Sequence, residues 1–181
     1  YGDRQFRYAH IYNGGGVAAG VTLENIVATA NHRDLLVAAA ASAGAKSITV
    51  TLGATAATAD YYNEGYIHIN DVTGQGQLLR IKDHPAADSG ATLVLTLYDP
   101  LKTAITADPS SKADLIASNY KSINTASNTP VGVIVGVSTI AMTANYYGWI
   151  QTSGPCSVLT SGTLVLGQAA VRSDSTAGAV E

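Results

Sequence analysis

The chain has 181 residues, 46 % of them hydrophobic, which suffices for one large domain or two small ones with a buried core. Only 13 % are charged and the formal net charge is −3, so the surface is dominated by small and neutral polar residues. The basic residues stand singly, which argues against nucleic-acid binding, and no apolar stretch is long enough to cross a membrane as a helix. A surface with so little charge to desolvate is easily buried against a neighbour. We therefore expect association, with an ordinary monomer as the alternative.

Residues 1–44 are expected to form an N-terminal arm and loop region. Its alternation of basic and aromatic side chains suits an arm that docks on a neighbouring molecule. The candidate docking residues of the arm are Arg4, Phe6, Arg7 and Tyr8.

Residues 31–43 fit two structures. As a helix, the segment would begin at Asn31 as the N-cap, carry Asp34 near its positive end and stop at Gly44. As a strand, the apolar residues 35–37 and the alanines after them would lead into the next strand, because tertiary context overrides alanine's helix propensity. Both structures stay open, and the fold is expected to hold at most one short helix.

Short strands dominate the rest of the chain. Residues 47–52 alternate strictly between polar and apolar side chains and include several β-branched residues, which predicts a strand. Gly, Pro, Asn, Asp and Ser fill the gaps between such runs, a pattern typical of an all-β barrel or sandwich. Further strands are expected at 65–70, 77–81, 91–97, 131–137, 148–152, 156–159 and 163–166.

A polar stretch divides these strands into two modules. Residues 119–129 are poor in large apolar residues and rich in Ser, Asn and Thr, which predicts a linker or long loop. The expected division is a β module over 45–118 and a C-terminal β domain over 130–181.

A short internal repeat agrees with two modules. Thr-Ala-Asp-Tyr-Tyr at 58–62 and Thr-Ala-Asn-Tyr-Tyr at 143–147 each precede glycine, an aromatic residue and isoleucine. Convergence of two β-turns would give the same pattern. The repeat places paired tyrosines at two strand entrances, where they are candidate interface anchors or core residues. The aromatic candidates are Tyr61, Tyr62, Tyr146, Tyr147 and Trp149.

Two polar groupings resemble parts of known sites but fit a structural role better. His68 with Asp71 could be half of a catalytic triad, yet no serine lies in a Gly-x-Ser-x-Gly turn. Asp83 and Asp88 flank His84, and together they offer too few oxygen ligands for a cation.

A third grouping is the carboxylate pair Asp60 and Glu64, which could act on a glycoside beside sugar-stacking tyrosines. Those tyrosines serve equally well as interface anchors. The four histidines and the lone Cys156 lack the spacing of paired zinc ligands. We predict no catalytic, cofactor-binding or metal-binding residue and a non-enzymatic protein; a carbohydrate-binding or hydrolytic module is the alternative.

Two stretches resemble β modules of phage proteins. Residues 65–81, in which alternating hydrophobics enter a Gly-x-Gly-Gln turn at 74–77, resemble a module of tailed-phage virion proteins. Residues 147–180 contain an aromatic strand that runs into Gly-Pro, followed by a Gly-x-Leu-Val-x-Gly pattern at 162–167. This second stretch resembles the small β domain of capsid decoration proteins, also called cement proteins.

The resemblance implies a virion structural protein that binds the outer surface of the phage head and stabilises it, after assembly in the host cytoplasm. The implied partners are further copies of the chain, as a homotrimer, and the major capsid protein. No cofactor and no catalytic residue are implied. Oligomerisation would cover the strand edges of small β domains, and attachment at several points would strengthen the binding. A tail- or fibre-associated virion protein is the alternative.

Overall fold

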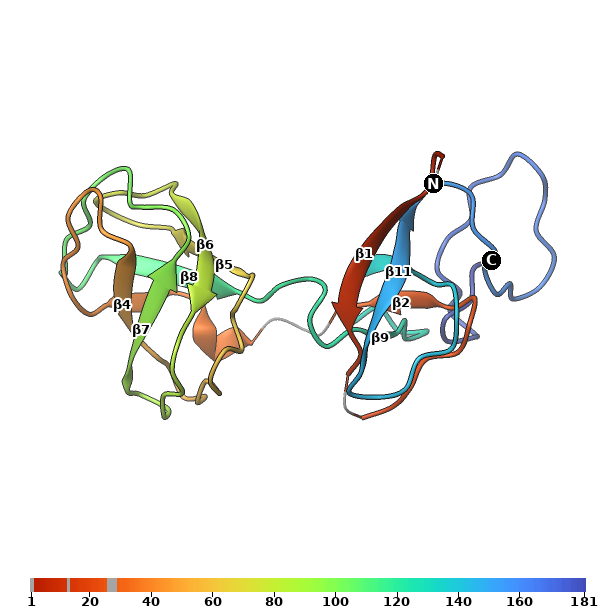
Figure 1. The fold of residues 1–181 in the computed structure, drawn as a ribbon, viewed down its shortest axis with the longest axis horizontal. Coiled ribbons are helices and arrows are strands. Elements are labelled where there is room, and N and C mark those ends of the chain that lie inside the picture. Colours follow the sequence, from red (N-terminus) through yellow and green to blue (C-terminus); the bar gives the residue numbers. More distant parts are fainter. Residues whose placement is uncertain (1, 13, 26–28) are drawn as a thin grey trace. The chain divides into compact units, whose positions relative to one another are not determined.

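The structure is a computed structural model that describes residues 2–12, 14–25 and 29–181. The fold is all-β, as predicted: short strands make up the regular structure, and the helical part of the described residues is a single 3-10 turn at Ala30–His32 (Figure 1). The chain divides into two compact units. We call residues 28–118 the barrel unit, and residues 1–27 with 119–181 the sheet unit.

The barrel unit is a closed barrel with the strand order β3-β4-β7-β6-β5-β8. Every second side chain of β4 and β7 points into the barrel, where Ile48, Val50, Leu93 and Leu95 are buried. The polar-apolar alternation of the sequence therefore corresponds to the outside and the inside of the barrel. The strands are β3 Leu35–Val37, β4 Ser47–Thr51, β5 Tyr66–Ile69, β6 Leu78–Asp83, β7 Thr92–Leu97 and β8 Lys112–Ile116.

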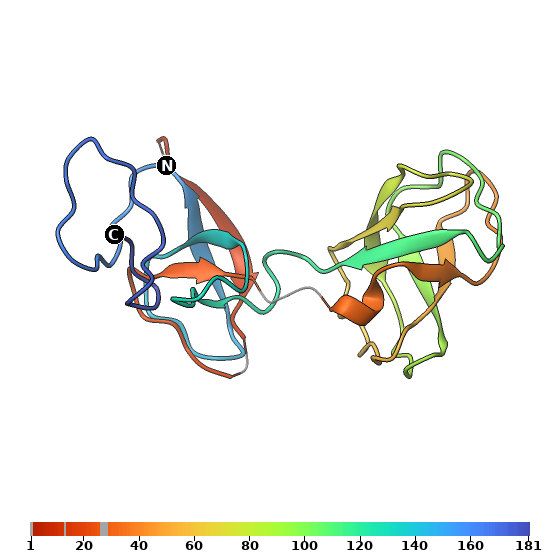
Figure 2. The same ribbon diagram turned by 180° about the vertical axis from the view of Figure 1, so that it is seen from behind.

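The sheet unit holds a five-stranded sheet with the order β1-β11-β10-β2-β9. Ile11, Leu23, Ile123 and Ile150 are fully buried in its core. β1 and β11 lie side by side in both views (Figures 1 and 2). The strands are β1 Gln5–His10, β2 Thr22–Glu24, β9 Asn124–Thr125, β10 Ile134–Ser138 and β11 Tyr147–Ser153.

The two units share one pattern of connection. In the barrel unit, the chain runs from β4 through Ala57 and a turn to β5, and from β6 through Ala87 and a turn to β7. β4 and β7 form an outer pair, and β5 and β6 form an inner pair. A bridge between Ala57 and Ala87 joins the two connections. In the sheet unit, β1 leads through Val17 to β2, and β10 through Met142 to β11. Here β1 and β11 form the outer pair, and β2 and β10 form the inner pair. A bridge between Val17 and Met142 again joins the two connections.

The four turns of this pattern end alike. Gly20, Asp60, Gly90 and Asn145 have φ angles of 75°, 61°, 73° and 63°. Asp and Asn adopt this left-handed region more readily than other residues with a side chain. Asp60 and Asn145 are the third residues of the two copies of the internal repeat, so the repeat marks two turns with the same backbone conformation. The first turn leads to β5, a strand of the inner pair, and the second leads to β11, a strand of the outer pair.

Most predicted strands are present, with ends shifted by a few residues. The segment 31–43 contains the strand β3 and no α-helix; Asn31 lies inside the 3-10 turn, and Asp34 has a φ of 54°. The strands predicted at 156–159 and 163–166 are wrong. Glycines with positive φ interrupt this region, and its side chains are largely exposed, so no buried face selects a strand there.

The division of the chain differs from the one expected. The supposed linker 119–129 contains β9, which pairs with β2, and its Ile123 and Ala126 are fully buried. The supposed arm is divided, because β1 and β2 belong to the sheet unit whereas β3 closes the barrel. Pairing between distant segments of the chain, rather than local composition, sets both boundaries.

Candidate functional site

Four rings gather on one face of β1 and β11. Antiparallel pairing places Tyr8 opposite Trp149 and His10 opposite Tyr147, and strand alternation directs all four side chains to the same side. The ring centroids of Tyr8 and Tyr147 are 5.5 Å apart at 14°, those of Tyr8 and Trp149 are 5.2 Å apart, and those of His10 and Tyr147 are 4.7 Å apart. We call these four residues the aromatic strip.

The aromatic strip is a surface rather than a core. Tyr8, Tyr147 and Trp149 keep 55 %, 61 % and 58 % of their surface exposed, although each is large and apolar enough to be buried. Tyr and Trp offer wide contact area with few rotatable bonds, which makes them frequent anchors at protein interfaces. The near-parallel stack of Tyr8 on Tyr147 covers one face of each ring.

The predicted candidates near the N-terminus also lie on or beside β1. The Arg4 guanidinium lies 5.8 Å from the Phe6 ring centroid, and that of Arg7 lies 5.7 Å from the Tyr120 ring centroid. Phe6, Arg7 and Tyr8 belong to a strand of the sheet, with Arg4 directly before it, and not to a free arm. Tyr146 is 67 % exposed at the turn before β11.

Tyr62, by contrast, is not an exposed anchor. It is 1 % exposed inside the barrel unit, and the half-buried Tyr61 ring packs edge-on against it. The tyrosines of the two repeat copies therefore differ in exposure, because the pair in the barrel unit turns inward and the pair in the sheet unit is exposed. The exposed aromatic candidates that the structure brings together all belong to the sheet unit.

Two buried histidines hold Tyr62 in place. His32 Nε2 donates to the carbonyl of Thr55 at 2.8 Å, which leaves Nδ1 to accept from the Tyr62 hydroxyl. His84 Nδ1 donates to the carbonyl of Pro85 at 2.8 Å, and Nε2 accepts from the Tyr62 amide at 2.9 Å. Burial raises the pKa of the Tyr62 hydroxyl well above its ordinary value of 10.0. His84 is therefore a buried structural residue and does not present a cation site with its neighbouring aspartates.

The other two predicted groupings also have structural partners. His68 faces Asp114, with 3.8 Å between Nδ1 and Oδ2, while Asp71 accepts from the backbone amide of the next residue. Glu64 pairs with Arg80 and accepts from the Tyr98 hydroxyl, and this hydrogen bond raises the pKa of Tyr98. His68 and Glu64 thus each have a charged partner within the barrel unit.

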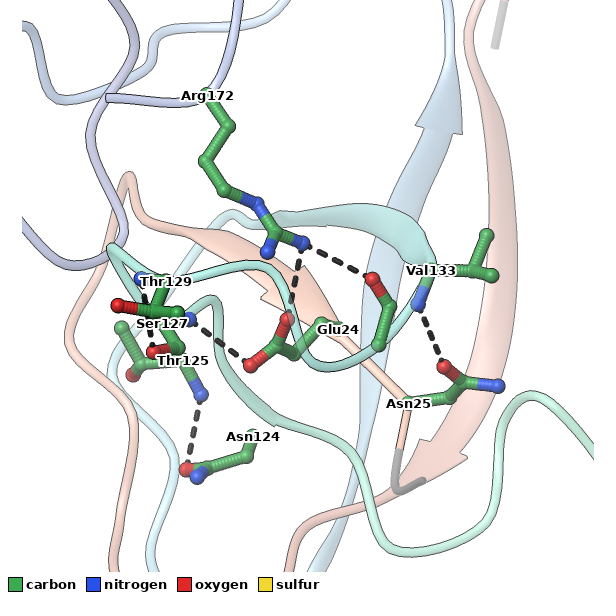
Figure 3. Close-up of polar contacts among 9 residues, drawn as sticks. Glu24, Asn25, Asn124, Thr125, Ser127, Thr129, Val133 and Arg172 are labelled. Atoms are coloured by element: carbon green, nitrogen blue, oxygen red, sulfur yellow. Dashed lines mark hydrogen bonds and ion pairs between the residues drawn. The ribbon is translucent and has the colours of Figure 1, made fainter. Parts of the chain in front are cut away.

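A buried ion pair that the sequence did not reveal joins the C-terminal segment to β2. Arg172 Nη2 donates to Glu24 Oε2 at 2.9 Å and to the carbonyl of Gly132 at 3.1 Å (Figure 3). Glu24 Oε1 accepts from the Ser127 amide at 2.9 Å. The two side chains are 13 % and 4 % exposed, so the pair is a buried link between the C-terminal segment and β2. It had no sequence signal, because its partners are far apart in the chain.

No group of three or more His, Cys, Asp or Glu side chains that could hold a metal ion occurs within residues 2–12, 14–25 and 29–181. Across that same part of the chain, no helix has the length and apolarity needed to cross a membrane.

Comparison of the chain with protein families, curated proteins and solved structures found no match.

Proposed function

We propose that the chain is a non-enzymatic structural protein of a tailed-phage virion, a decoration protein that binds the outer surface of the head and stabilises it. The observation that carries the proposal is the aromatic strip, in which three large rings are more than half exposed. An exposed aromatic cluster on a small domain is typical of a protein-binding surface.

Two further features support this proposal. The surface carries few charges, so covering it desolvates little. Residues 65–81 and 147–180 resemble virion and head-decoration modules, and the second stretch contains Tyr147 and Trp149. The proposed partners are the major capsid protein and further copies of the chain, as a homotrimer, on the capsid surface.

The test is reconstitution of the head. Purified protein is added to heads stripped of it, and binding is measured by sedimentation and electron microscopy. We expect wild-type protein to bind and Trp149→Ala to bind at least roughly tenfold more weakly, as for an interface anchor. Tyr66→Ala is the control, because Tyr66 is a partly exposed ring on the barrel unit.

Stability of the particle gives a second measurement. Heads that lack the protein should release DNA at a lower temperature than complete heads. Absence of the protein from purified DNA-filled heads would refute the proposal, and its presence on tails alone would favour the tail-associated alternative.

A further inference from the structure

β1 is an outer strand of the sheet, and only part of its outer side is covered. At one end, His10 N donates to Tyr120 O and Ile123 N donates to His10 O, both at 2.9 Å. Ile11 N donates to Tyr146 O at 2.9 Å, which is the side of β11. Residue 10 therefore directs its backbone groups away from β11, and residue 11 directs its amide towards it.

Backbone groups alternate between the two sides of a strand. Tyr8 and Phe6 consequently direct their amides and carbonyls to the same outer side as His10. Within the part of the chain that the structure describes, no strand pairs with β1 on that side. These two residues form an open strand edge, a site where an extended segment can add to a sheet.

The side chains along this edge define the chemistry of the added segment. Tyr8 lies on the face of the aromatic strip, beside Trp149. Arg7 points to the opposite face and is exposed, and Arg4 is exposed just before the strand. β1 contains no acidic residue. A neighbouring strand would thus meet an aromatic ring on one face and a guanidinium on the other.

We propose that the open edge of β1 binds an extended segment of a partner protein in which apolar and acidic residues alternate. Apolar side chains would pack beside Tyr8, and acidic ones would face Arg7. A second copy of β1 is a poorer occupant, because pairing Phe6 opposite Tyr8 sets two Arg7 side chains directly opposite each other, and like charges there repel. The proposal does not depend on whether the partner is a phage capsid.

The test uses short capped peptides as probes, with binding followed by NMR at the amides of Phe6 and Tyr8. An alternating Val-Glu hexapeptide should shift these two amides most strongly. A Val-Lys hexapeptide should bind at least roughly tenfold more weakly, and Arg7→Glu should reverse that preference. A Val-Glu peptide with N-methyl groups on the pairing amides should not bind.

A matched pair of variants separates backbone pairing from the tyrosine ring. Tyr8→Ala and Tyr8→Pro both remove the ring, but only proline removes the amide on the open side; an edge strand tolerates this change because the amide is not bonded to β11. We expect Tyr8→Pro to bind the Val-Glu peptide at least roughly tenfold more weakly than Tyr8→Ala.

Equal binding by these two variants would overturn the proposal, as would equal binding of the acidic and basic peptides or no binding of the Val-Glu peptide at millimolar concentration. A wild-type dimer whose contact maps to Phe6 and Tyr8 would show instead that a second copy occupies the edge. If Tyr8→Pro still binds stripped heads, the open edge of β1 is not the contact with the head. The proposal that the chain is a virion protein would be unaffected by that result.

Discussion

Gly65 and Gly148 are the glycines that follow the paired tyrosines in the two copies of the internal repeat, and they face different neighbours. A Cβ on Gly65 would lie 2.2 Å from the backbone carbonyl oxygen of Ile116. A Cβ on Gly148 would lie 2.2 Å from Sδ of Met142, which is a flexible side chain. The two glycines of the repeat are thus required for different reasons, close backbone approach at Gly65 and side-chain packing at Gly148.

This difference predicts unequal costs of the same substitution. Gly65→Ala should destabilise the barrel unit by about 2 kcal/mol or more, because two backbone segments must separate. Gly148→Ala should cost about 1 kcal/mol, and Gly148→Ala with Met142→Ala should show coupling between the two sites. Urea denaturation monitored by circular dichroism measures both; equal costs would contradict the distinction.

The buried ion pair predicts an asymmetric response to mutation. Arg172→Met leaves the Glu24 carboxylate buried without its cation, which should destabilise the sheet unit by about 3–5 kcal/mol. The double variant Glu24→Gln with Arg172→Met should recover a large part of this loss, since no buried charge remains. Trp149 is the single tryptophan and lies in the sheet unit, so its fluorescence follows that unit during denaturation. A double variant as unstable as Arg172→Met would contradict this account.

Val72 offers a stabilising substitution. Its φ is 62°, a conformation that is strained for a β-branched side chain. Val72→Asn should stabilise the barrel unit by about 1 kcal/mol, because asparagine adopts this conformation more readily. Val131→Asn, at an exposed valine outside the positive-φ set, is the control and should change the melting temperature little. A lower melting temperature for Val72→Asn would contradict the prediction.

Tyr62 predicts a loss of stability at alkaline pH. In the unfolded chain its hydroxyl ionises near the ordinary pKa of 10.0, whereas burial raises the pKa in the folded barrel, where the hydroxyl stays neutral. The stability that depends on this group is therefore complete below pH 10 and declines as the pH rises from there towards the folded-state pKa.

Tyr62→Phe tests this dependence. At pH 8 the variant should be less stable by about 1–3 kcal/mol, because His32 loses its hydrogen-bond donor. Between pH 8 and pH 11, however, its stability should fall less than that of the wild type. Parallel declines in the two proteins, measured by urea denaturation, would assign the alkaline loss to other groups.

Local patterns were sufficient for the strands that have one buried face. Residues 47–52 and 91–97 alternate regularly, and the structure pairs them inside the barrel. The same patterns misled at 163–166, where apolar residues lie in an exposed loop. A run of apolar residues forms a strand only when a neighbouring strand pairs with it and one of its faces is buried.

The aromatic strip was predictable in its residues but not in its assembly. Tyr8, Tyr147 and Trp149 stand out as aromatic candidates, yet nothing local pairs Tyr8 with a residue near the other end of the chain. His10 was missed, although its position two residues after Tyr8 places it on the same face of a strand. Tyr62 resembled Tyr147 in sequence, and only burial against His32 and His84 separates their roles.

The barrel unit lies between β2 and β9 in the chain, and this has a consequence for the order of folding. All strands of the barrel lie close in sequence, whereas β1 must wait for β11 to be synthesised. Once the barrel has closed, Leu35 and Ala113 are paired neighbours. The effective length of the loop that joins the two segments of the sheet unit is then much shorter than the number of residues in it. Shortening a loop in this proportion lowers the entropic cost of closing it by about 1–2 kcal/mol. A barrel that closes early would thus bring the two chain segments of the sheet unit close to each other before they pair.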